Sequence, residues 1–444
     1  MVGVSEIVFG LDALPVTRDP HWPVDVNGRL LAGALLRPLW DNGFGSAVDA
    51  ESLDGAKLWR VTLSDELRWS DGRPLAAEDA VRAASRAIER RPGSVSAVRA
   101  VDSRTVEYQF DRPVGYAQHV LSMPRFAPSR DDLVLGPYAV SSWTSSEIVL
   151  ERNPWHAFGP DQPKRLVFRL TKTPDEILAA YANGEIDVTP ITSFGPHELS
   201  AIADRPDLVR RDILLYGSLD FGSRSGELGT AARLRAALGR LLRRAEIAAA
   251  TGGTARPCWS PLQPWFGEVS EQDGFDAAEL RAACPDGRLH IDYADYTPNA
   301  EVVEEIARQI REAIGVEVTS AAHPFEDYIK LAVSREHCLL YTLTAPEYPH
   351  PAAVLGPWAS TGAQARHAGF ADTEFDALVT EACALPDSEA AAPWMDAAWR
   401  WCEVMPKISL LQVRAHGLCA PRVGGLDLAM DGTMPMRNLV VHDA

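Results

Sequence analysis

The clearest pattern of apolar and polar positions in the amino-terminal third of the chain is that of two short strands. Apolar and polar side chains alternate over residues 58–63 and again over 105–110, which predicts two strands, each buried on one face. Between them, the small and apolar residues of 76–90 recur with a period of about 3.6 residues, which predicts a helix. Asp71-Gly72, just before this helix, predicts a tight turn.

A capping box marks the start of another helix near the middle of the chain. Thr173 can cap the helix, Pro174 suits its first position, and Glu176 can bond back to the cap. These residues predict a helix that begins at Pro174 and ends at Asn183-Gly184. Apolar and acidic residues alternate directly afterwards, which predicts a strand over 186–188.

Two longer helices are predicted in the following part of the chain. Residues 233–250 place leucines on one side and five arginines on the rest, which predicts one continuous amphipathic helix. Residues 301–314 carry valine or isoleucine at every fourth position, and Gly315 ends this helix. The period then changes at 316–318 to that of a strand. Helices that alternate with strands predict an α/β architecture.

The composition is that of an ordinary folded protein. The chain has 444 residues, of which 46 % are hydrophobic and 23 % are charged, so wholesale disorder is excluded. A chain of this length predicts two or three domains. Its 61 acidic and 43 basic residues give a net charge of −18, which argues against a nucleic-acid partner because such proteins concentrate Lys and Arg. No apolar run of about 18 residues is present, so we expect no transmembrane segment.

All the cysteines lie in the second half of the chain. They form no C-x-x-C pair, and no histidine is spaced to complete a zinc site, so we expect neither a metal nor another cofactor. The sequence is compatible with a Cys258–Cys284 disulfide in an exported protein, or with unpaired buried thiols. The six residues are Cys258, Cys284, Cys338, Cys383, Cys402 and Cys419.

The amino terminus leaves two locations open. Residues 1–6 have neither the basic nor the apolar region of a signal peptide. We therefore expect a cytoplasmic protein if Met1 is the native start, and an extracytoplasmic protein, periplasmic or lipid-anchored, if a leader has been removed.

Six segments, in this order, resemble the motifs of the family 5 solute-binding proteins of ABC importers, a group that includes peptide- and nickel-binding members. The first, L-R-W-S-D-G-R-P-L-A-A-E-D, is similar to the family's W-x-D-G-x-P-x-T-A-x-D-V. The others are similar to G-P-Y with L-x-x-N-P-x-Y, to G-E-x-D, to the V-R-x-A-L helix, to the G-I-x-V turn and to N-x-x-x-D-x-L. They lie at residues 67–79, 136–138 with 151–155, 184–187, 234–244, 314–318 and 370–376.

This resemblance implies a two-lobed α/β fold of the periplasmic-binding-protein type (class II, cluster C) with a small accessory domain. By analogy, the first lobe combines residues 1–45, 132–253 and 413–444, the accessory domain covers 46–131, and the second lobe covers 254–412. The resemblance also implies that a ligand is enclosed between the lobes by a hinge motion.

One departure from the family affects its usual peptide anchor. In peptide-binding members, a carboxylate in a D-P motif of the second lobe holds the amino group of the ligand. The corresponding residues here, 342–351, contain no Asp, and Glu347 is the carboxylate that could take this role. The alternative is a solvated loop residue. His350 and His367 are similar to histidines of the nickel-complex binders, but we expect no metal site at them.

Other candidate ligand contacts follow from the resemblance or from their aromatic character. Arg18 stands in the segment that replaces the family's L-D-P motif and could pair with a ligand carboxylate. Aromatic residues in loops often line pockets, although core or surface packing is the alternative for each. The full set of candidates is Arg18, Tyr216, Phe221, Ser223, Trp259, Glu347, Tyr348, His350 and Trp358.

The sequence carries no recognisable enzyme motif. Arg224 stands where a nucleophile elbow needs Ser, and neither a phosphate loop nor H-E-x-x-H is present. The resemblance implies a non-catalytic monomer that captures a small peptide-like or polar organic ligand and delivers it to an ABC permease. The alternative is a repurposed cytoplasmic member that acts as an enzyme or a ligand sensor, with Glu347, Tyr348 and His350 as acid–base candidates.

Overall fold

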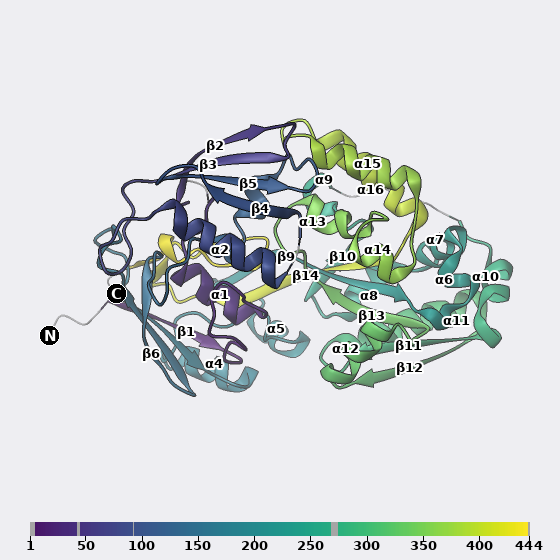
Figure 1. Ribbon diagram of the computed structural model, residues 1–444. Helices are drawn as coiled ribbons and strands as arrows, with labels where there is room; N and C mark the ends of the chain where they lie inside the picture. The colour runs from purple at the N-terminus through teal and green to yellow at the C-terminus, as the bar shows by residue number, and fades with distance from the viewer. Residues whose placement is uncertain (1–4, 42–44, 92, 268–273, 443–444) are drawn as a thin grey trace.

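The computed structural model describes residues 5–41, 45–91, 93–267 and 274–442 of the chain. Two lobes lie side by side in Figure 1, with a smaller group of strands above the left one. None of the helices in these ranges combines the length and the apolar character that a membrane crossing needs.

The first lobe is built around a four-stranded sheet in which β1 runs parallel to β8, and β7 and β6 follow in antiparallel order. The strands are β1 (Glu6–Leu11), β8 (Arg165–Leu170), β7 (Glu147–Arg152) and β6 (Tyr138–Trp143). The other elements are α1 (Val26–Leu35), α4 (Pro174–Ala182), α5 (Pro196–Ile202), β15 (Val423–Gly424), η5 (Met436–Asn438) and β16 (Val440–Val441). In the core of this lobe the rings of Phe9 and Phe168 stack 5.1 Å apart.

The second lobe contains a six-stranded mixed sheet, and α7, α8, α10 and α11 pack against one of its faces through an apolar core. The strands, in spatial order, are β10 (Ala255–Pro257), β14 (Ile408–Leu418), β9 (Leu208–Phe221), β13 (Leu339–Thr344), β11 (Arg288–Ala294) and β12 (Glu317–His323). The helices are η2 (Ser223–Ser225), α6 (Glu227–Thr230), α7 (Ala232–Leu241), α8 (Arg244–Ala250), α9 (Gln263–Phe266), α10 (Ala277–Ala283), η3 (Pro285–Gly287), α11 (Asn299–Ile314), α12 (Phe325–Ser334), α13 (Pro351–Leu355), η4 (Gly356–Trp358), α14 (Ala363–Ala368), α15 (Thr373–Ala384) and α16 (Ala391–Val404).

Two long strands, β9 and β14, connect the lobes. Leu219 and Ile408 on these strands belong to the core of the second lobe, whereas Ile213 and Ala415 belong to the core of the first. The two strands pair with each other, and their register shifts twice within residues 409–414. Such irregularities bend a strand pair locally, so this stretch is suited to act as a hinge.

The smaller group of strands, here called the accessory domain, forms an antiparallel sheet in the order β2-β3-β5-β4. Its elements are β2 (Ala47–Leu53), β3 (Leu58–Leu63), α2 (Ala77–Arg90), β4 (Val95–Ala100), β5 (Thr105–Phe110), α3 (Ala117–Leu121) and η1 (Pro124–Phe126). Its core, which includes Trp69 and Tyr108, continues into α15 and α16 through Phe375, Trp394 and Trp401. These helices lie beside the ends of the accessory strands in Figure 1.

Two carboxylates of the family-like motifs are buried inside this framework. Asp79 is 1 % exposed and accepts hydrogen bonds from the indole of Trp69 (3.0 Å) and the guanidinium of Arg130 (2.6 and 2.8 Å). Asp187 is also buried and accepts two hydrogen bonds of 2.6 Å from Arg422. These motif residues therefore stabilise the fold through buried hydrogen bonds.

Most of the predicted elements are confirmed, but residues 233–250 form two helices instead of one. The chain leaves the helical path at Leu242 and Arg243, between α7 and α8. Two of the arginines expected on the polar side, Arg235 and Arg244, are buried and donate to backbone carbonyls. Arg244 also donates to the carbonyl of Leu242 (3.2 Å), at the break itself.

Two further expectations are settled by the structure. The strand predicted at 186–188 is wrong, because Val188 makes only isolated bridges to Phe9 and Cys419. The cysteines are free thiols, and five of the six are buried. Cys258 and Cys284 lie in different apolar clusters, which explains why they are not paired.

Candidate functional site

The side chains of β9 divide between two faces, because alternate residues of a strand point to opposite sides of the sheet. Leu219 and Phe221 face the apolar core of the second lobe. Tyr216, Ser218 and Asp220 therefore lie on the other face, on a strand that connects the lobes. We call this surface the polar face of β9.

An ion pair between a buried lysine and a half-buried aspartate lies at one end of the polar face. The Nζ atom of Lys407 is 3.0 Å from Oδ1 of Asp220 and 3.1 Å from Oγ1 of Thr344. The Thr342 hydroxyl donates to Asp220 (3.3 Å), and Lys407 Nζ lies 6.0 Å from the ring centre of Trp358, within the range of a cation–π contact. Since Lys407 is only 9 % exposed, its charge is balanced mainly by Asp220 rather than by water.

Two hydroxyl groups of the same face are buried without a hydrogen-bond partner among the described residues. They are Oη of Tyr216 and Oγ of Ser218, in side chains that are 6 % and 1 % exposed. Burial raises the pKa of Tyr216 well above its usual value, so its hydroxyl is neutral and can donate. Tyr216 packs in one cluster with Cys258, and Met430 of the carboxy-terminal part of the chain contacts that cluster. Leaving a buried hydroxyl unpaired costs about 1–3 kcal/mol, which a bound polar molecule or water would offset.

Three other candidate residues lie away from the polar face of β9. Phe221 packs in the core of the second lobe, on the side opposite to Tyr216. Ser223 is exposed, and its hydroxyl donates to the carbonyl of Arg335 (2.9 Å). Arg18, in the first lobe, places its guanidinium 5.2 Å from the ring centre of Trp143. The structure therefore does not bring these three side chains together with Tyr216.

Trp259 and Trp358 are the two tryptophans among the candidates. Trp358 lies beside Lys407 and packs edge-on against Trp401. Trp259 directly follows Cys258, and its Nε1 atom is buried without a partner in the described chain. Trp358 therefore borders the polar face of β9, and Trp259 adjoins the Tyr216 cluster.

Glu347, the candidate peptide anchor, contacts the accessory domain. Its two carboxylate oxygens pair with Arg91 (2.5 Å) and Arg125 (2.9 Å), which follow α2 and lie in η1, respectively. A ligand ammonium would have to compete with two guanidinium groups for this carboxylate. Glu347 therefore joins the second lobe to the accessory domain, a role that its sequence position does not predict.

His350 is buried next to the accessory domain. Its Nδ1 atom accepts a hydrogen bond from the backbone N–H of Ala352 (3.1 Å), so His350 caps the start of α13. Its ring stacks on Tyr116 with the centres 4.5 Å apart, and the ring of Tyr348 stacks with both, 6.2 Å from Tyr116 and 6.5 Å from His350. The candidates Tyr348 and His350 therefore join the second lobe to the accessory domain.

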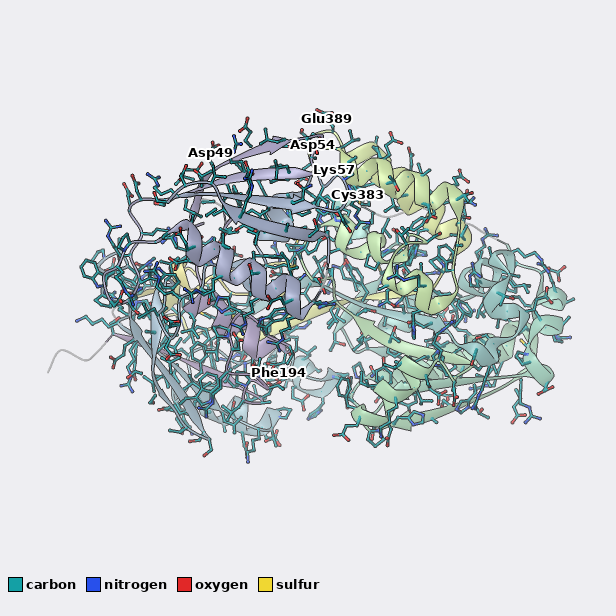
Figure 2. All side chains as sticks on the ribbon, in the orientation of Figure 1. Asp49, Asp54, Lys57, Phe194, Cys383 and Glu389 are labelled. Atoms are coloured by element: carbon teal, nitrogen blue, oxygen red, sulfur yellow. The ribbon has the colours of Figure 1, made fainter. Side chains whose placement is uncertain are left out.

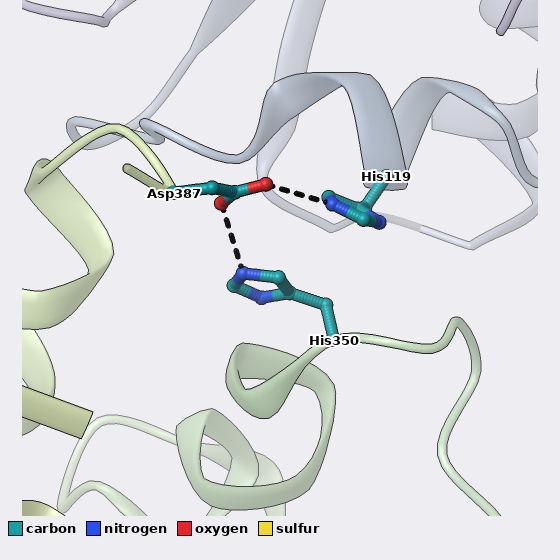
Figure 3. Close-up of side chains that lie close together, drawn as sticks. All are labelled: His119, His350 and Asp387. Carbon is teal, nitrogen blue, oxygen red and sulfur yellow. Dashed lines mark hydrogen bonds and ion pairs between the residues drawn. The ribbon is translucent and has the colours of Figure 1, made fainter. Parts of the chain in front are cut away.

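Asp387 brings His350 together with His119, as Figure 3 shows. Its two oxygens lie 2.9 Å from Nε2 of His119 and 3.1 Å from Nε2 of His350. Histidine and carboxylate groups this close could hold a metal ion. However, Nδ1 of His350 already accepts from Ala352, so in the neutral ring Nε2 carries the proton and donates to Asp387 instead of offering a lone pair. The geometry thus favours a hydrogen-bonded contact, and His367 lies apart from it, bonded to Ala332.

Several of these residues could not be singled out in the sequence. Ser218 and Asp220 follow Tyr216 at intervals of two, so the alternation of a strand would have placed all three on one face. Lys407 has no such signal, because only the pairing of β14 with β9 brings it to Asp220. His119 and Asp387 are 268 residues apart and meet only through the tertiary structure.

The comparison with known families identifies this architecture. Residues 45–366 match the family described as bacterial extracellular solute-binding proteins, family 5. The chain belongs to this family. The resemblance expected from the six motifs is therefore confirmed.

Family 5 relatives resemble the chain over part of its sequence and nearly all of its fold. It is 26 % identical to the periplasmic oligopeptide-binding protein OppA of Escherichia coli, over 37 % of this chain and 38 % of that protein. It is 28 % identical to the probable deoxycholate-binding periplasmic protein YgiS of Escherichia coli, over 26 % of this chain and 27 % of that protein. These matches span well under half the length of either relative.

The structure of HbpA2 from Haemophilus parasuis superimposes with a TM-score of 0.83 at 17 % identity, and the match covers 98 % of this chain and 100 % of that one. At this identity the likeness establishes the fold alone. The predicted two-lobed α/β fold is confirmed.

Proposed function

We propose that this family 5 protein is a receptor outside the cytoplasm that captures a small peptide-like or other polar organic ligand between its lobes and delivers it to an ABC permease. The family description supports an extracellular binding role. The names of two relatives, one oligopeptide-binding and one deoxycholate-binding, support a receptor for small organic molecules of which peptides are one class. We assign residues 227–250, predicted in the first lobe, to the second lobe, since α7 and α8 pack in its apolar core, and we otherwise keep the boundaries predicted from the sequence.

One observation carries the proposal for the site. Tyr216 and Ser218 present buried hydroxyls without a partner in the described chain, on a strand that belongs to both lobes. The ion pair of Asp220 and Lys407 adds a strong acceptor and a strong donor to the same face. A polar ligand with hydroxyl, carbonyl or charged groups would satisfy these atoms, and Trp358 would provide an apolar wall.

This location differs from the anchor that the family resemblance implies. A ligand amino group at Glu347 would have to displace Arg91 or Arg125. We therefore place the main polar contacts of the ligand on the polar face of β9, with Glu347 outside them.

The first prediction concerns these hydroxyls. In a variant that combines Tyr216→Phe with Ser218→Ala, each lost hydrogen bond is expected to weaken binding by about 1 kcal/mol, which together is about thirtyfold in affinity. Native mass spectrometry of the freshly purified protein identifies any small molecule that it retains. Thermal shifts with di- and tripeptides and amino-acid derivatives provide the probes for calorimetric titration of both proteins.

Tyr108→Phe is the matched control. Its hydroxyl is also buried without a partner in the described chain, but it lies in the core of the accessory domain. We expect this variant to bind every probe as the wild type does. Equal affinity of the double variant and the wild type for a bound probe would place the ligand elsewhere.

A catalytic role for the loop that contains Glu347, Tyr348 and His350 is not proposed. Glu347 is paired with two arginines, and His350 holds both ring nitrogens in hydrogen bonds. Burial raises the pKa of Tyr348, so its phenol is a poor base at neutral pH. A probe that stabilises the protein but is recovered chemically changed would nevertheless indicate an enzyme.

A further inference from the structure

The accessory domain shares an apolar core with α15 and α16 of the second lobe, and a group of hydrogen-bonded and aromatic contacts at the same boundary is here called the seam. Its backbone part is a hydrogen bond from the N–H of Gly115 to the carbonyl of Cys383 (2.9 Å). Cys383 lies where the accessory strands meet the helices of the second lobe (Figure 2). The aromatic part is the stack of Tyr116 on His350. These contacts join residues far apart in the chain, so they can separate without breaking a helix or a strand.

Asp387 lies at the centre of the seam between two imidazoles. His119, in α3, keeps 35 % of its side chain exposed and Asp387 keeps 52 %, whereas only 7 % of the His350 side chain is exposed. The two rings lie 4.8 Å apart, and Trp394 packs edge-on against His350. One carboxylate thus lies within hydrogen-bond distance of two imidazoles.

The number of protons at this point decides the charge of the seam. A proton on the more exposed His119 turns its contact with Asp387 into an ion pair and leaves the three groups neutral overall. A second proton, on His350, adds an uncompensated positive charge in a buried position close to the first. Such a charge is unfavourable in a poorly solvated environment.

The other titratable and charged groups around His350 do not relieve this charge. Tyr116, which precedes α3, and Tyr348, from the same loop as His350, are neutral phenols whose pKa values are raised by burial. Glu347 is already paired with two arginines. The remaining groups of the seam are Arg112, which interacts with both tyrosines, and the thiol of Cys383.

We propose that the seam is a proton-dependent contact, which holds the accessory domain against the second lobe while His350 is neutral and releases it when His350 is protonated. This regulation goes beyond the proposed capture of a ligand and does not depend on which ligand is bound. Acid would thereby favour separation of the second lobe from the accessory domain, and with it an opened protein.

The sign of the effect follows from the environment of His350. Burial lowers its pKa in the closed seam, and the hydrogen bond to Asp387 offsets this only in part. The pKa of Asp387 is held well below its usual value by hydrogen bonds from His119 and His350, so it stays ionised. An opened seam therefore binds more protons than a closed one below about pH 6.5, and the contribution of neutral His350 is lost as the pH falls through its lowered pKa.

Hydrogen exchange of the unliganded full chain tests this second prediction. Mass spectrometry follows residues 114–121, 345–353 and 383–388 at pH 7.5 and pH 5.5, with each rate corrected for the intrinsic effect of pH. We expect protection of all three segments in the wild type to fall by up to about tenfold per pH unit, the limit for one linked proton. Strands β7 and β8 of the first lobe serve as an internal reference that keeps its protection.

His350→Asn isolates the titrating group, because Asn is a good N-cap and can still accept from Ala352. We expect the acid-induced loss of protection to disappear in this variant and to weaken in His119→Gln, where Asp387 alone balances His350. His367→Asn, an exposed histidine of the same lobe, should respond to pH as the wild type does.

Two results would overturn the proposal. One is an equal loss of protection in His350→Asn and in the wild type. The other is stoichiometric binding of zinc or nickel that closes the seam and is lost in His350→Asn, which would make these residues a metal site. Neither result depends on ligand capture at the polar face of β9, so failure of that function would be recognised separately, by unchanged affinity in the Tyr216 and Ser218 variants.

Discussion

Replacement of Asp79 with alanine is expected to lower the free energy of unfolding by about 3–5 kcal/mol. The carboxylate is 1 % exposed and accepts from the indole of Trp69, the backbone of Ala76 and, twice, from Arg130. Without it, the guanidinium of Arg130, whose side chain is 17 % exposed, has no buried counter-charge, and the indole N–H loses its acceptor. Urea denaturation of wild type and variant at pH 7 measures the difference.

Asp65→Ala is the matched control for this prediction. Asp65 is a carboxylate of the same region that lies 2.9 Å from Arg104, but 68 % of its side chain is exposed. Exposed ion pairs contribute about 0–1 kcal/mol, so this variant should unfold close to the wild type. If Asp79→Ala lowers the free energy of unfolding by less than about 1 kcal/mol, water replaces the carboxylate. The motif at residues 67–79 would then be needed only for its tight turn.

The sequence predicts much of the fold because many of its elements follow local patterns. Strands β3 and β5 follow from the near-alternation of apolar and polar side chains, and α11 follows from apolar residues at every fourth position, because each pattern is set by a local period. The break between α7 and α8 depends instead on the burial of Arg244 against distant carbonyls. A local pattern contains no information about such acceptors.

The candidate site was less accessible from the sequence for the same reason. Tyr216 is a candidate because of the family resemblance, and Ser218 and Asp220 share its face of β9 by simple alternation. Lys407 reaches Asp220 only through strand pairing. The position of Glu347 suggests a ligand anchor, but the carboxylate is paired with Arg91 and Arg125, which come from the accessory domain.

Gly115→Ala is expected to open the seam at neutral pH. A Cβ atom at this position would lie 1.9 Å from the carbonyl oxygen and 2.3 Å from the carbonyl carbon of Leu385, both of which are backbone atoms that cannot rotate away. Overpacking of this kind costs about 1–3 kcal/mol, and loss of the hydrogen bond from Gly115 to Cys383 raises the cost of closing the seam by about 1 kcal/mol more. The equilibrium constant for closing the seam should therefore fall by about a hundredfold. Small-angle X-ray scattering should detect a larger radius of gyration, and hydrogen exchange should detect lost protection at 383–388.

Gly93→Ala separates this effect from a general cost of removing a glycine from the accessory domain. Its Cβ atom would meet nothing closer than the carbonyl of Arg91 at 3.8 Å, an ordinary contact. We expect Gly93→Ala to match the wild type at pH 7.5, and Gly115→Ala at pH 7.5 to lose at least as much protection as the wild type loses at pH 5.5. Because its seam is already open, Gly115→Ala should also show no further loss of protection in acid. Wild-type protection in Gly115→Ala at neutral pH would mean that other contacts hold the accessory domain in place, so that neither the glycine nor the histidines control it.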